Sequence, residues 1–354
     1  MREPVYALIL AGGGGTRLWP ASRRRRPKQL LTLGGRESLL RASFRRATKI
    51  FGAEHTLVVT AADQAEAVGH ELPDLPPANL IAEPAARNTG PAVGLGAVAV
   101  ARRAGKGALL AVLPSDAFVA DEPAFAEVLG KASAHAGETI VTIGVKPTRP
   151  ETGYGYLERG ELVRDGVYRV ARFVEKPDAA TAVRYLADPG FLWNAGMFFF
   201  SAERLLAEVR SHLPDLATIL DELYAAPDLG KAAAERYPAA PKISIDYGIM
   251  EKASGLRVVA GDFGWNDVGS WSALADIRAQ DSAGNVVAGD VVASGVSGSV
   301  LVSEPGAPLL GVVGVDDVVV VATRDAVLVV RKDRAQEVRA VVAALAAAKR
   351  DELL

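Results

Sequence analysis

Residues 5–20 read Val5-Tyr6-Ala7-Leu8-Ile9-Leu10-Ala11-Gly12-Gly13-Gly14-Gly15-Thr16-Arg17-Leu18-Trp19-Pro20. The apolar run at the start predicts a buried strand, and four glycines follow it almost at once. Because glycines carry no Cβ, their backbone N–H groups stay open to an approaching anion, which is typical of a phosphate or nucleotide site. A glycine-rich turn that serves only backbone geometry is the alternative.

Two familiar glycine motifs do not match this loop. A P-loop continues with Gly-Lys-Ser/Thr, whereas this chain has Arg17 and Leu18, and the dinucleotide motif GxGxxG needs a glycine where Arg17 stands. ATPase and dehydrogenase functions are therefore both disfavoured. A second match, GxGxxA at residues 94–99, follows a polar loop inside an Ala/Val-rich helical segment, so it indicates close helix packing.

The composition excludes several other classes of protein. The 354 residues suggest about two domains, and a formal net charge of -2 argues against nucleic acid as a partner. The absence of cysteine excludes disulfides and thiolate metal sites, and the four histidines are scattered without a ligand spacing. Without a signal-like start or a long apolar run, we expect a soluble, cytoplasmic protein with no membrane partner. The basic cluster at residues 23–26 is interpreted as a solvated face with no catalytic role.

Strand and helix patterns alternate through the first half of the chain. We expect strands at residues 5–10, 56–60, 79–82, 108–113 and 139–145, and helices at 39–50, 91–104 and 123–136. This alternation predicts an α/β fold with a doubly wound, mostly parallel, Rossmann-like sheet. Ligands of such sheets bind at the carboxyl ends of the strands, where the glycine loop and the Ser115-Asp116 pair both fall.

The second half of the chain has a different sequence pattern. Paired strand signals around Gly160 and Gly166 predict an antiparallel insertion, residues 198–200 a buried strand, and residues 178–186, 202–211 and 270–280 helices. Short Val-rich runs at 285–293, 299–302, 309–313, 318–322 and 326–330 predict a small β domain with a terminal helix from about residue 335. We expect a catalytic domain over residues 1–281 and a β-rich domain over 282–354, whose repeats are too few and irregular for a full solenoid.

Residues 10–20 with Pro27-Lys28-Gln29 resemble the signature of sugar-1-phosphate nucleotidyltransferases. Further blocks resemble the mannose-1-phosphate guanylyltransferase branch of that family, in order along residues 5–275: Glu83-Pro-Ala-Ala-Arg-Asn-Thr89, Phe173-Val-Glu-Lys-Pro177, Trp193-Asn-Ala-Gly-Met197, Ser244-Ile-Asp-Tyr247 and Gly264-Trp-Asn-Asp-Val-Gly-Ser-Trp271. The long isomerase extension of the bifunctional members does not follow, so a single-function enzyme is expected.

The resemblance implies that a phosphate oxygen of mannose 1-phosphate attacks the α-phosphorus of GTP and that pyrophosphate leaves. A sugar phosphate is already anionic, so this chemistry requires alignment and cations more than a general base. Arg17 and Lys28 are the candidate cations, and by resemblance Asp116 and Asp267 hold Mg²⁺. The family often has a histidine after the first of these aspartates, where this chain has Ala117.

The remaining candidates bind the two substrates. Glu83 is expected to accept the two adjacent N–H donors of guanine, with a structural ion pair as the alternative. The nucleotide-binding candidates are Leu10, Ala11, Gly12, Gly13, Gly14, Gly15, Thr16, Glu83, Arg87, Asn88, Thr89 and Ser115. The sugar-phosphate candidates are Gly153, Gly155, Glu175, Lys176, Asn194 and Asp246.

Three other functions compete with this one. A nucleotidyltransferase with another sugar phosphate or base would have the same motifs. A catalytically silent, nucleotide-sugar-sensing subunit should have lost some of the four catalytic candidates, and all are present; an NAD-binding oxidoreductase is excluded by Arg17. The sequence does not fix the oligomeric state, and a homodimer is kept as one candidate assembly.

Overall fold

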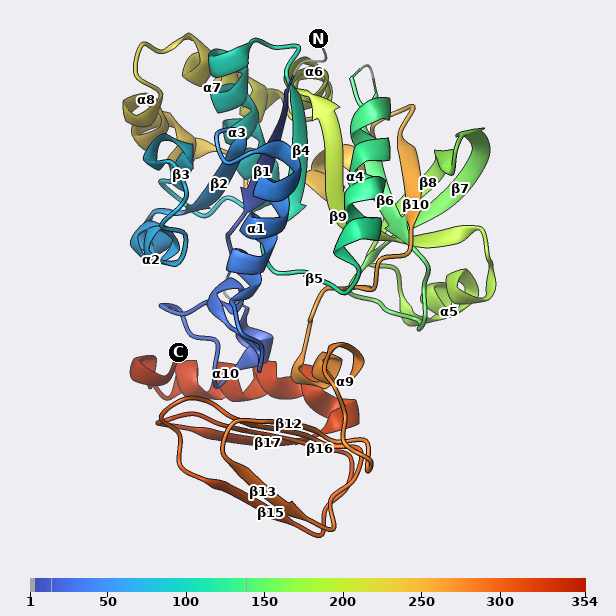
Figure 1. Cartoon of the computed structure of the whole chain (residues 1–354). Coiled ribbons are helices and arrows are strands. Elements are labelled where there is room, and N and C mark those ends of the chain that lie inside the picture. Colours follow the sequence, from blue (N-terminus) through green and yellow to red (C-terminus); the bar gives the residue numbers. More distant parts are fainter. Residues whose placement is uncertain (1–3, 14, 138) are drawn as a thin grey trace. The chain divides into compact units, whose positions relative to one another are not determined.

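The structure is a computed structural model that describes residues 4–13, 15–137 and 139–354. Its residues form two compact units, each built from several segments of the chain (Figure 1). The first unit comprises the chain up to Gly12 with Ser43–Ser115 and Asp121–Trp265. The second comprises Gly13–Ala42, Asp116–Ala120 and Asn266–Leu354.

A nine-stranded sheet forms the centre of the first unit, in the order β3-β2-β1-β4-β9-β6-β10-β8-β7. Its strands are β1 (Val5–Leu10), β2 (Thr56–Ala61), β3 (Leu80–Glu83), β4 (Leu109–Pro114), β6 (Val141–Val145), β7 (Gly155–Arg164), β8 (Val167–Glu175), β9 (Phe191–Ser201) and β10 (Arg257–Gly261). The strands β3, β2, β1 and β4 pair in parallel, as do β6 and β10. The α/β class is therefore confirmed, but the sheet is mixed, because β9 runs antiparallel between β4 and β6, and β7 and β8 form the expected antiparallel hairpin.

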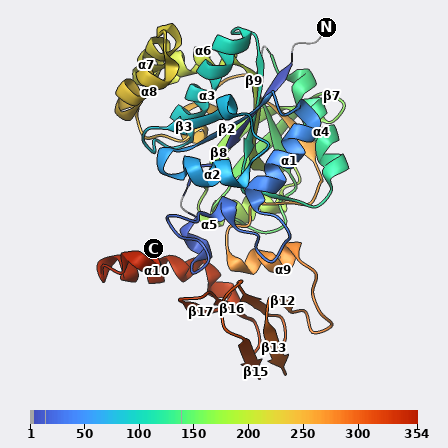
Figure 2. The same cartoon turned by 60° about the vertical axis from the view of Figure 1, so that its left-hand side comes forward.

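Helices cover both faces of this sheet (Figure 1, Figure 2). They are α2 (Ala65–Glu71), α3 (Thr89–Ala104), α4 (Glu122–His135), α5 (Ala179–Ala187), α6 (Ala202–His212), α7 (Pro214–Ala225) and α8 (Leu229–Arg236), while α1 (Leu39–Phe51) crosses the unit boundary at residue 42. Shorter turns are η3 (Ala62–Gln64), η4 (Pro77–Asn79), η5 (Tyr237–Ala239) and a π-helical turn, η6 (Asp246–Met250). No described helix is both long enough and apolar enough to cross a membrane.

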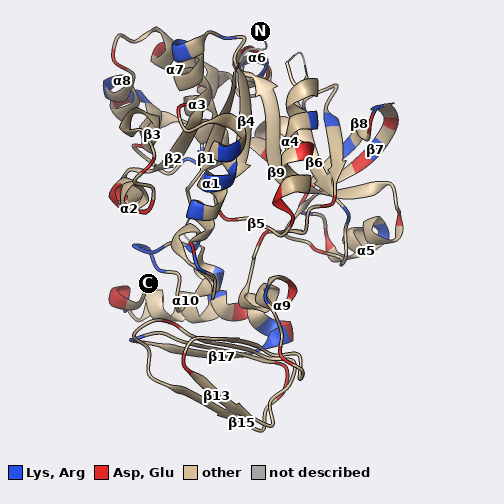
Figure 3. Cartoon of the chain, viewed as in Figure 1, with Lys and Arg blue, Asp and Glu red and all other residues tan. Residues whose placement is uncertain are grey.

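The hairpin of β7 and β8 carries charges of both signs, which Figure 3 shows as blue and red segments on its strands. Glu158 on β7 lies opposite Arg172 on β8, and the two side chains form an ion pair at 3.0 Å. The strands of this hairpin therefore present a polar face to solvent, as an antiparallel pair at a sheet edge commonly does.

The second unit contains a small parallel β structure. The strands β12 (Val286–Ala288), β14 (Val300–Ser303) and β16 (Val318–Ala322) pair in parallel, β17 (Val327–Arg331) closes the row antiparallel, and β13 (Val291–Ser294) pairs in parallel with β15 (Leu310–Val313). One face of the larger sheet buries Leu301 and Val320 against the smaller sheet. The other face buries Val300 and Val319 in a second core, so both faces are apolar and the strands are nearly continuous valine.

That second core also takes in the start of the chain. Leu18, Trp19 and Leu31 pack in it with Trp271 and with Val338 of α10 (Val338–Ala347). The remaining elements of the unit, or at its boundary, are η1 (Thr16–Leu18), η2 (Lys28–Leu30), β5 (Phe118–Val119), β11 (Trp265–Asn266), η7 (Trp271–Ala273), α9 (Leu274–Ile277), η8 (Lys332–Glu337) and η9 (Asp351–Leu353). The glycine-loop segment is thus part of the hydrophobic core of the β-rich unit.

Several expected elements differ from those observed. The helix expected at 270–280 is only the short pair η7 and α9, because Arg278 turns to extended backbone and donates to the carbonyls of Thr32 and Leu33. The run 285–293 is two strands, because Gly289, at φ 85°, turns the chain where a Cβ would overlap the Ser303 carbonyl. The sequence patterns did not predict the helices α2, α7 and α8 or the strand β10.

The GxGxxA segment is confirmed as a packing element in α3. A Cβ on Gly96 would overlap the Leu8 side chain, and one on Gly94 would lie 2.7 Å from Leu220. We expect Gly96→Ala to destabilise the protein by about 1–3 kcal/mol through overpacking. The matched control is Gly130→Ala in α4, where nothing lies within 4 Å, and helix propensity should add about 0.5–1 kcal/mol. Urea unfolding measures both, and equal midpoints would contradict the close packing.

Candidate functional site

The signature loop, residues 13–28, closes tightly on itself. Gly15 has φ 53°, and a Cβ there would overlap the Lys28 side chain and lie 3.0 Å from the Lys28 backbone nitrogen. Gly13 has φ 115° with open space around it. The backbone conformation therefore requires glycine at position 15 for two reasons, and it leaves Gly13 accessible. Gly14 lies outside the described residues, and Thr16 is exposed at the start of η1.

Lys28 is the centre of a charged cluster in the second unit. Its Nζ lies 2.7 Å from Asp116 Oδ2 and also donates to the main-chain carbonyl of Asp267. The Lys28 side chain is 11% exposed, whereas that of Asp116 is 40% exposed and open to a ligand. One ammonium thus joins the signature loop to two carboxylate-bearing segments that are about 90 and 240 residues further along the chain.

The side chains of Arg17 and Asp267 both lie close to Gly269. A Cβ on Gly269 would lie 2.8 Å from a carboxylate oxygen of Asp267 and 3.4 Å from a guanidinium nitrogen of Arg17. Arg17 forms no hydrogen bond or ion pair with the residues that the structure describes. The structure therefore brings together all four candidates for catalysis, and it leaves the Arg17 guanidinium available for an anion.

A strained turn holds the Asp267 carboxylate. Val268 has φ 48°, which is an outlier for a β-branched residue, and its N–H donates to Asn266 Oδ1 at 2.8 Å. The Gly269 N–H donates to Asp267 Oδ1 at 3.1 Å, and Trp271 Nε1 donates to the Trp19 carbonyl at 3.0 Å. Such strain clusters at functional sites. The sequence motif contains Asn266 and Trp271, but it does not predict these hydrogen bonds.

Asp116 and Asp267 suit a magnesium ion. Mg²⁺ in phosphate-transfer sites is held by one or two carboxylates and completes its shell with substrate oxygens and water. Among the described residues no group of three or more His, Cys, Asp or Glu could hold a metal without such help. Lys28 contacts the Asp116 carboxylate and the Asp267 main-chain carbonyl, so both aspartates lie beside one ammonium and fit a metal that binds together with a phosphate.

A second polar site lies in the first unit, around Glu83 at the end of β3. The Glu83 side chain is buried, and Oε1 accepts a hydrogen bond from the Tyr237 hydroxyl. Burial raises the pKa of the Glu83 carboxyl, and the Tyr237 hydrogen bond only partly opposes this rise. A Cβ on Gly12 would lie 3.9 Å from Glu83 Oε2, so the second oxygen faces the start of the glycine loop. Tyr237 was not anticipated, and no motif marks it.

The residues after Glu83 hold the loop in place. Arg87 donates to the Pro238 carbonyl, the Asn88 side chain accepts from the Thr89 N–H at 2.8 Å, and Thr89 Oγ1 accepts from the Ile245 N–H at 3.0 Å. No ion pair joins Arg87 to Glu83 among the described contacts. These hydrogen bonds shape the loop, while the buried Arg87 Nε has no hydrogen-bond partner among the described residues.

The remaining nucleotide candidates lie at neighbouring strand ends. The Ser115 N–H donates to the Leu10 carbonyl at 3.3 Å, and the Ala11 N–H donates to the Val59 carbonyl at 2.7 Å. Thr60 Oγ1 donates to the Ala11 carbonyl at 2.9 Å. The strand end before the glycines is therefore fixed from two sides.

The sugar-phosphate candidates form a third cluster, also in the first unit. Asn194 Nδ2 donates to Asp246 Oδ1 at 3.2 Å, Lys176 Nζ pairs with Glu175, and a Cβ on Gly155 would lie 2.7 Å from Glu175 Oε2. The Thr142 hydroxyl donates to Asn194 Oδ1 at 3.0 Å and fixes the amide orientation. The Gly153 N–H donates to Glu151 Oε1 at 3.0 Å, and the neighbouring Tyr154 carbonyl accepts from the Lys176 N–H at 3.1 Å.

The charges in this cluster perturb one another. Burial and then the charge of Glu175 raise the pKa of Asp246 to about 7. Burial works against the charged form of Lys176, but the hydrogen bond and charge of Glu175, with Asp246, leave the Lys176 pKa above its usual range. Fixed acceptors next to a cation are what a ligand with hydroxyl and phosphate groups requires.

The family models that match the chain cover most of its length. Residues 6–284 match a model described as nucleotidyl transferase, and residues 289–345 match one described as a mannose-phosphate isomerase/GMP-like β-helix domain.

Three bacterial proteins are similar to the chain over nearly its whole length. The xanthan biosynthesis protein XanB of Xanthomonas campestris pv. campestris is 43% identical over 98% of this chain and 74% of its own length. A mannose-1-phosphate guanylyltransferase of Escherichia coli K12 is 40% identical over 99% of this chain and 75% of its own. A crystal structure described as mannose-1-phosphate geranyltransferase from Thermus thermophilus is 40% identical, with a TM-score of 0.87 over 96% of this chain and 99% of that one.

The raised pKa of Asp246 predicts how stability depends on pH. The folded protein binds this proton with a pKa of about 7, against an ordinary value of 3.8, so the folded state holds more protons between these values. Stability should therefore fall as pH rises through this range. Asp246→Asn retains the acceptor oxygen for Asn194 but cannot ionise. We expect the difference between urea midpoints at about pH 5 and about pH 8 to shrink in Asp246→Asn and to stay unchanged in the exposed control Asp290→Asn.

Proposed function

The chain belongs to the nucleotidyl transferase family, and on that premise we propose that its polar clusters serve one reaction, the transfer of GMP from GTP to mannose 1-phosphate, which gives GDP-mannose and pyrophosphate. The observation that carries the proposal is the Lys28 cluster, in which a buried ammonium contacts Asp116 and Asp267 beside the Arg17 guanidinium. A cluster of this kind supplies cations and metal ligands but no base for a nucleophile.

The reaction requires no residue to remove a proton. The attacking phosphate oxygen of mannose 1-phosphate is already ionised, so it needs alignment with the α-phosphorus of GTP, opposite the leaving pyrophosphate. We assign Arg17 to the phosphate oxygens, where its donors meet charge that grows during transfer. Lys28 neutralises charge on the triphosphate and orients Asp116.

Asp116 and Asp267 would hold Mg²⁺, which when bound neutralises phosphate charge and makes pyrophosphate a better leaving group. The strained turn at Val268 keeps the Asp267 carboxylate in place, with one oxygen held by the Gly269 N–H. Strain of this kind favours a fixed ligand over a mobile one.

Recognition of the two substrates is assigned to the first unit. Glu83 presents one carboxylate oxygen toward Gly12 while Tyr237 holds the other, which supports a role as acceptor for guanine donors. Glu175, Lys176 and Asn194 are assigned to the hydroxyls and phosphate of mannose 1-phosphate. Arg87, Asn88 and Thr89 are assigned to the shape of the base loop, because each of these side chains makes a hydrogen bond within the protein.

The alternatives differ in what they predict for purified protein. Another base or sugar would use the same Lys28 cluster, whereas a silent sensing subunit would have no turnover. Pyrophosphate release with four nucleoside triphosphates and several hexose 1-phosphates separates these cases. We expect GTP with mannose 1-phosphate to give the highest kcat/KM, and no release with any pair would refute the enzyme function. Three further expectations stay predictions. Cell fractionation would test the cytoplasmic location, and light scattering would test the homodimer. Limited proteolysis would test the domain boundary after residue 281.

The Lys28 cluster predicts which aspartates control turnover. Asp116→Asn and Asp267→Asn should each lower kcat by about a hundredfold or more, because each removes a charged ligand beside the leaving group. The matched control Asp262→Asn, an exposed aspartate, should retain full kcat. Pyrophosphate release at saturating Mg²⁺ measures all three, and near-normal turnover in either active-site variant would remove that residue from the metal site.

The two recognition sites predict separate defects. Glu83→Gln still accepts from Tyr237 but presents an NH₂ donor to a guanine donor, so its preference for GTP over ATP should fall. Asn194→Ala should raise the KM for mannose 1-phosphate, since an unpaired hydroxyl costs about 1–3 kcal/mol, and should leave the KM for GTP nearly unchanged. Steady-state kinetics with both substrates varied would test this. Equal effects on both substrates would contradict the assignment.

A further inference from the structure

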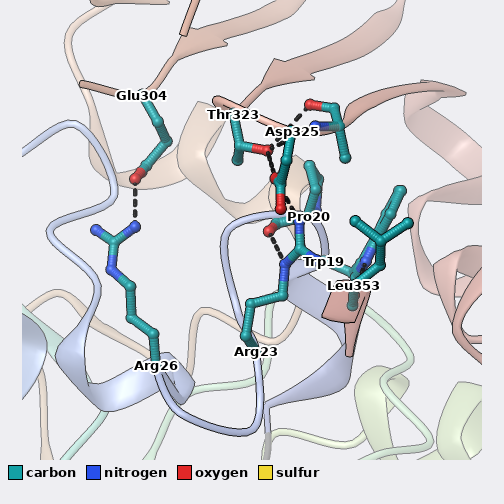
Figure 4. A network of polar contacts seen from close by, with 9 residues as sticks. Trp19, Pro20, Arg23, Arg26, Glu304, Thr323, Asp325 and Leu353 are labelled. Carbon is teal, nitrogen blue, oxygen red and sulfur yellow. Dashed lines mark hydrogen bonds and ion pairs between the residues drawn. The ribbon is translucent and has the colours of Figure 1, made fainter. Parts of the chain in front are cut away.

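The four arginines at residues 23–26 form a tight turn within the signature loop. Arg24, Arg25 and Arg26 are exposed, as expected of a solvated face, but Arg23 and Arg26 also form close ion pairs with carboxylates. The Arg23 N–H donates to the Arg26 carbonyl at 2.9 Å, and the Arg26 N–H donates back to the Arg23 carbonyl at 3.0 Å. The turn therefore places Arg23 and Arg26 at its two ends. Both of them reach the β-rich part of the same unit, as Figure 4 shows.

Arg23 is the more enclosed of the two. Its Nε donates to the Pro20 carbonyl at 2.6 Å, and its Nη2 donates to Asp325 Oδ1 at 2.9 Å (Figure 4). The side chain is 15% exposed, and its guanidinium lies over the Trp19 ring. Asp325 also accepts from the Thr323 hydroxyl at 2.9 Å, so the carboxylate is held in the β16–β17 turn.

Arg26 pairs with a carboxylate that has no other side-chain partner among the described residues. Its Nη1 lies 2.7 Å from Glu304 Oε2, and the Glu304 side chain is 5% exposed after the end of β14. A buried carboxylate of this kind holds its cation firmly, because separation would leave an uncompensated charge away from water.

A third contact joins the same two regions through tryptophan. Trp19 Nε1 donates to the Leu353 carbonyl at 2.9 Å, and the Trp19 carbonyl accepts from Trp271. Trp19 is itself buried in the core that contains Val300 and Val319. The signature loop is thus attached to the C-terminal part of the unit by the ion pairs of Arg23 and Arg26, by a longer one from Arg24 to Asp351 at 3.4 Å, by one indole bond and by a shared core.

The arginine turn is linked directly to the reacting part of the loop. The Ser22 hydroxyl, next to Arg23, donates to the Gly15 carbonyl at 2.8 Å, and the Leu18 N–H donates to the same carbonyl at 3.0 Å. Gly15 in turn packs against the Lys28 backbone. A displacement of the turn would therefore move the peptide groups that position Arg17 and Lys28.

We propose that Arg23 and Arg26 are positioning residues: through Asp325 and Glu304 the C-terminal β structure fixes the signature loop in the conformation that presents Arg17 and Lys28 to the triphosphate. This inference rests on the proposed nucleotidyl transfer.

The ion pairs line an open cavity of about 1040 Å³ with Arg24, Arg25 and Arg324. The same wall carries Glu304, Asp325, Asp351 and Glu352, so its charges nearly cancel, which favours a clamp over an anion-binding site.

A double-mutant cycle tests the clamp. Arg26→Gln and Glu304→Gln should each lower kcat by about tenfold or more, with the KM for mannose 1-phosphate within about twofold of its normal value. The double variant leaves no unpaired charge and should be no worse than either single variant. Arg26→Lys, which retains the charge, should recover part of kcat. Arg25→Gln, in the same turn but with no partner among the described residues, is the matched control and should retain full kcat.

Hydrogen exchange gives a readout that does not depend on the reaction. Peptides covering residues 15–28 should exchange faster in the two single variants and at the normal rate in Arg25→Gln. Exchange at the normal rate with full kcat in folded Arg26→Gln and Glu304→Gln would overturn the proposal, as would loss of kcat without faster exchange in the loop. An inactive wild-type protein whose loop exchange still depends on Arg26 would count against the proposed reaction and not against the clamp.

Discussion

The contact between the Lys28 ammonium, the Asp116 carboxylate and the Asp267 carbonyl is the interaction on which the candidate site depends. It joins three segments that are far apart in the sequence, and an ammonium that is almost buried cannot lose its partners without a large desolvation cost. The same contact leaves Asp116 partly open to solvent. The lysine therefore has two uses in one geometry: it organises the protein, and it brings positive charge to where phosphate would bind.

The surroundings of Lys28 are rigid for reasons of packing. Gly15 has no room for a side chain, Val268 is held in a left-handed conformation by Asn266, and Trp271 bonds the backbone of Trp19. Phosphoryl transfer depends on alignment of charged groups more than on proton transfer, so rigidity is the property that such a site most needs. The valine-rich sheet contributes to this rigidity, because one of its two apolar faces packs in the same core as Leu18, Trp19 and Leu31.

The expectations that rested on local pattern agree with the structure where one strong signal dominates. The strand at 5–10 is reproduced residue for residue, and the Gly166 hairpin and the strand at 318–322 are present as expected. The helices α7 and α8 were missed although local signals mark them: the buried Leu216, Leu220 and Leu223 of α7 recur at helical spacing, and the Asp228 side chain caps α8. Tyr237 could not be predicted as a partner of Glu83, since the contact joins residues 154 positions apart with no motif between them. The interpretation of residues 23–26 as a solvated face agrees with the exposure of most of these side chains. It missed the ion pairs of Arg23 and Arg26 for the same reason as Tyr237, because the carboxylate partners lie about 280 to 300 residues away.

The division of the chain into units has a consequence for how such proteins can be rearranged. The chain passes from one unit to the other after residues 12, 42, 115, 120 and 265. A truncation near the start of the β-rich strands would therefore remove Val300 and Val319. Leu18, Trp19 and Leu31 would then lack the core that covers them. Modules that join end to end can be exchanged by recombination at one junction, whereas these two units share the chain five times over. We expect natural variation of the β-rich region to proceed by substitution of single residues in its strands and turns. The contacts between this region and the signature loop should be inherited together.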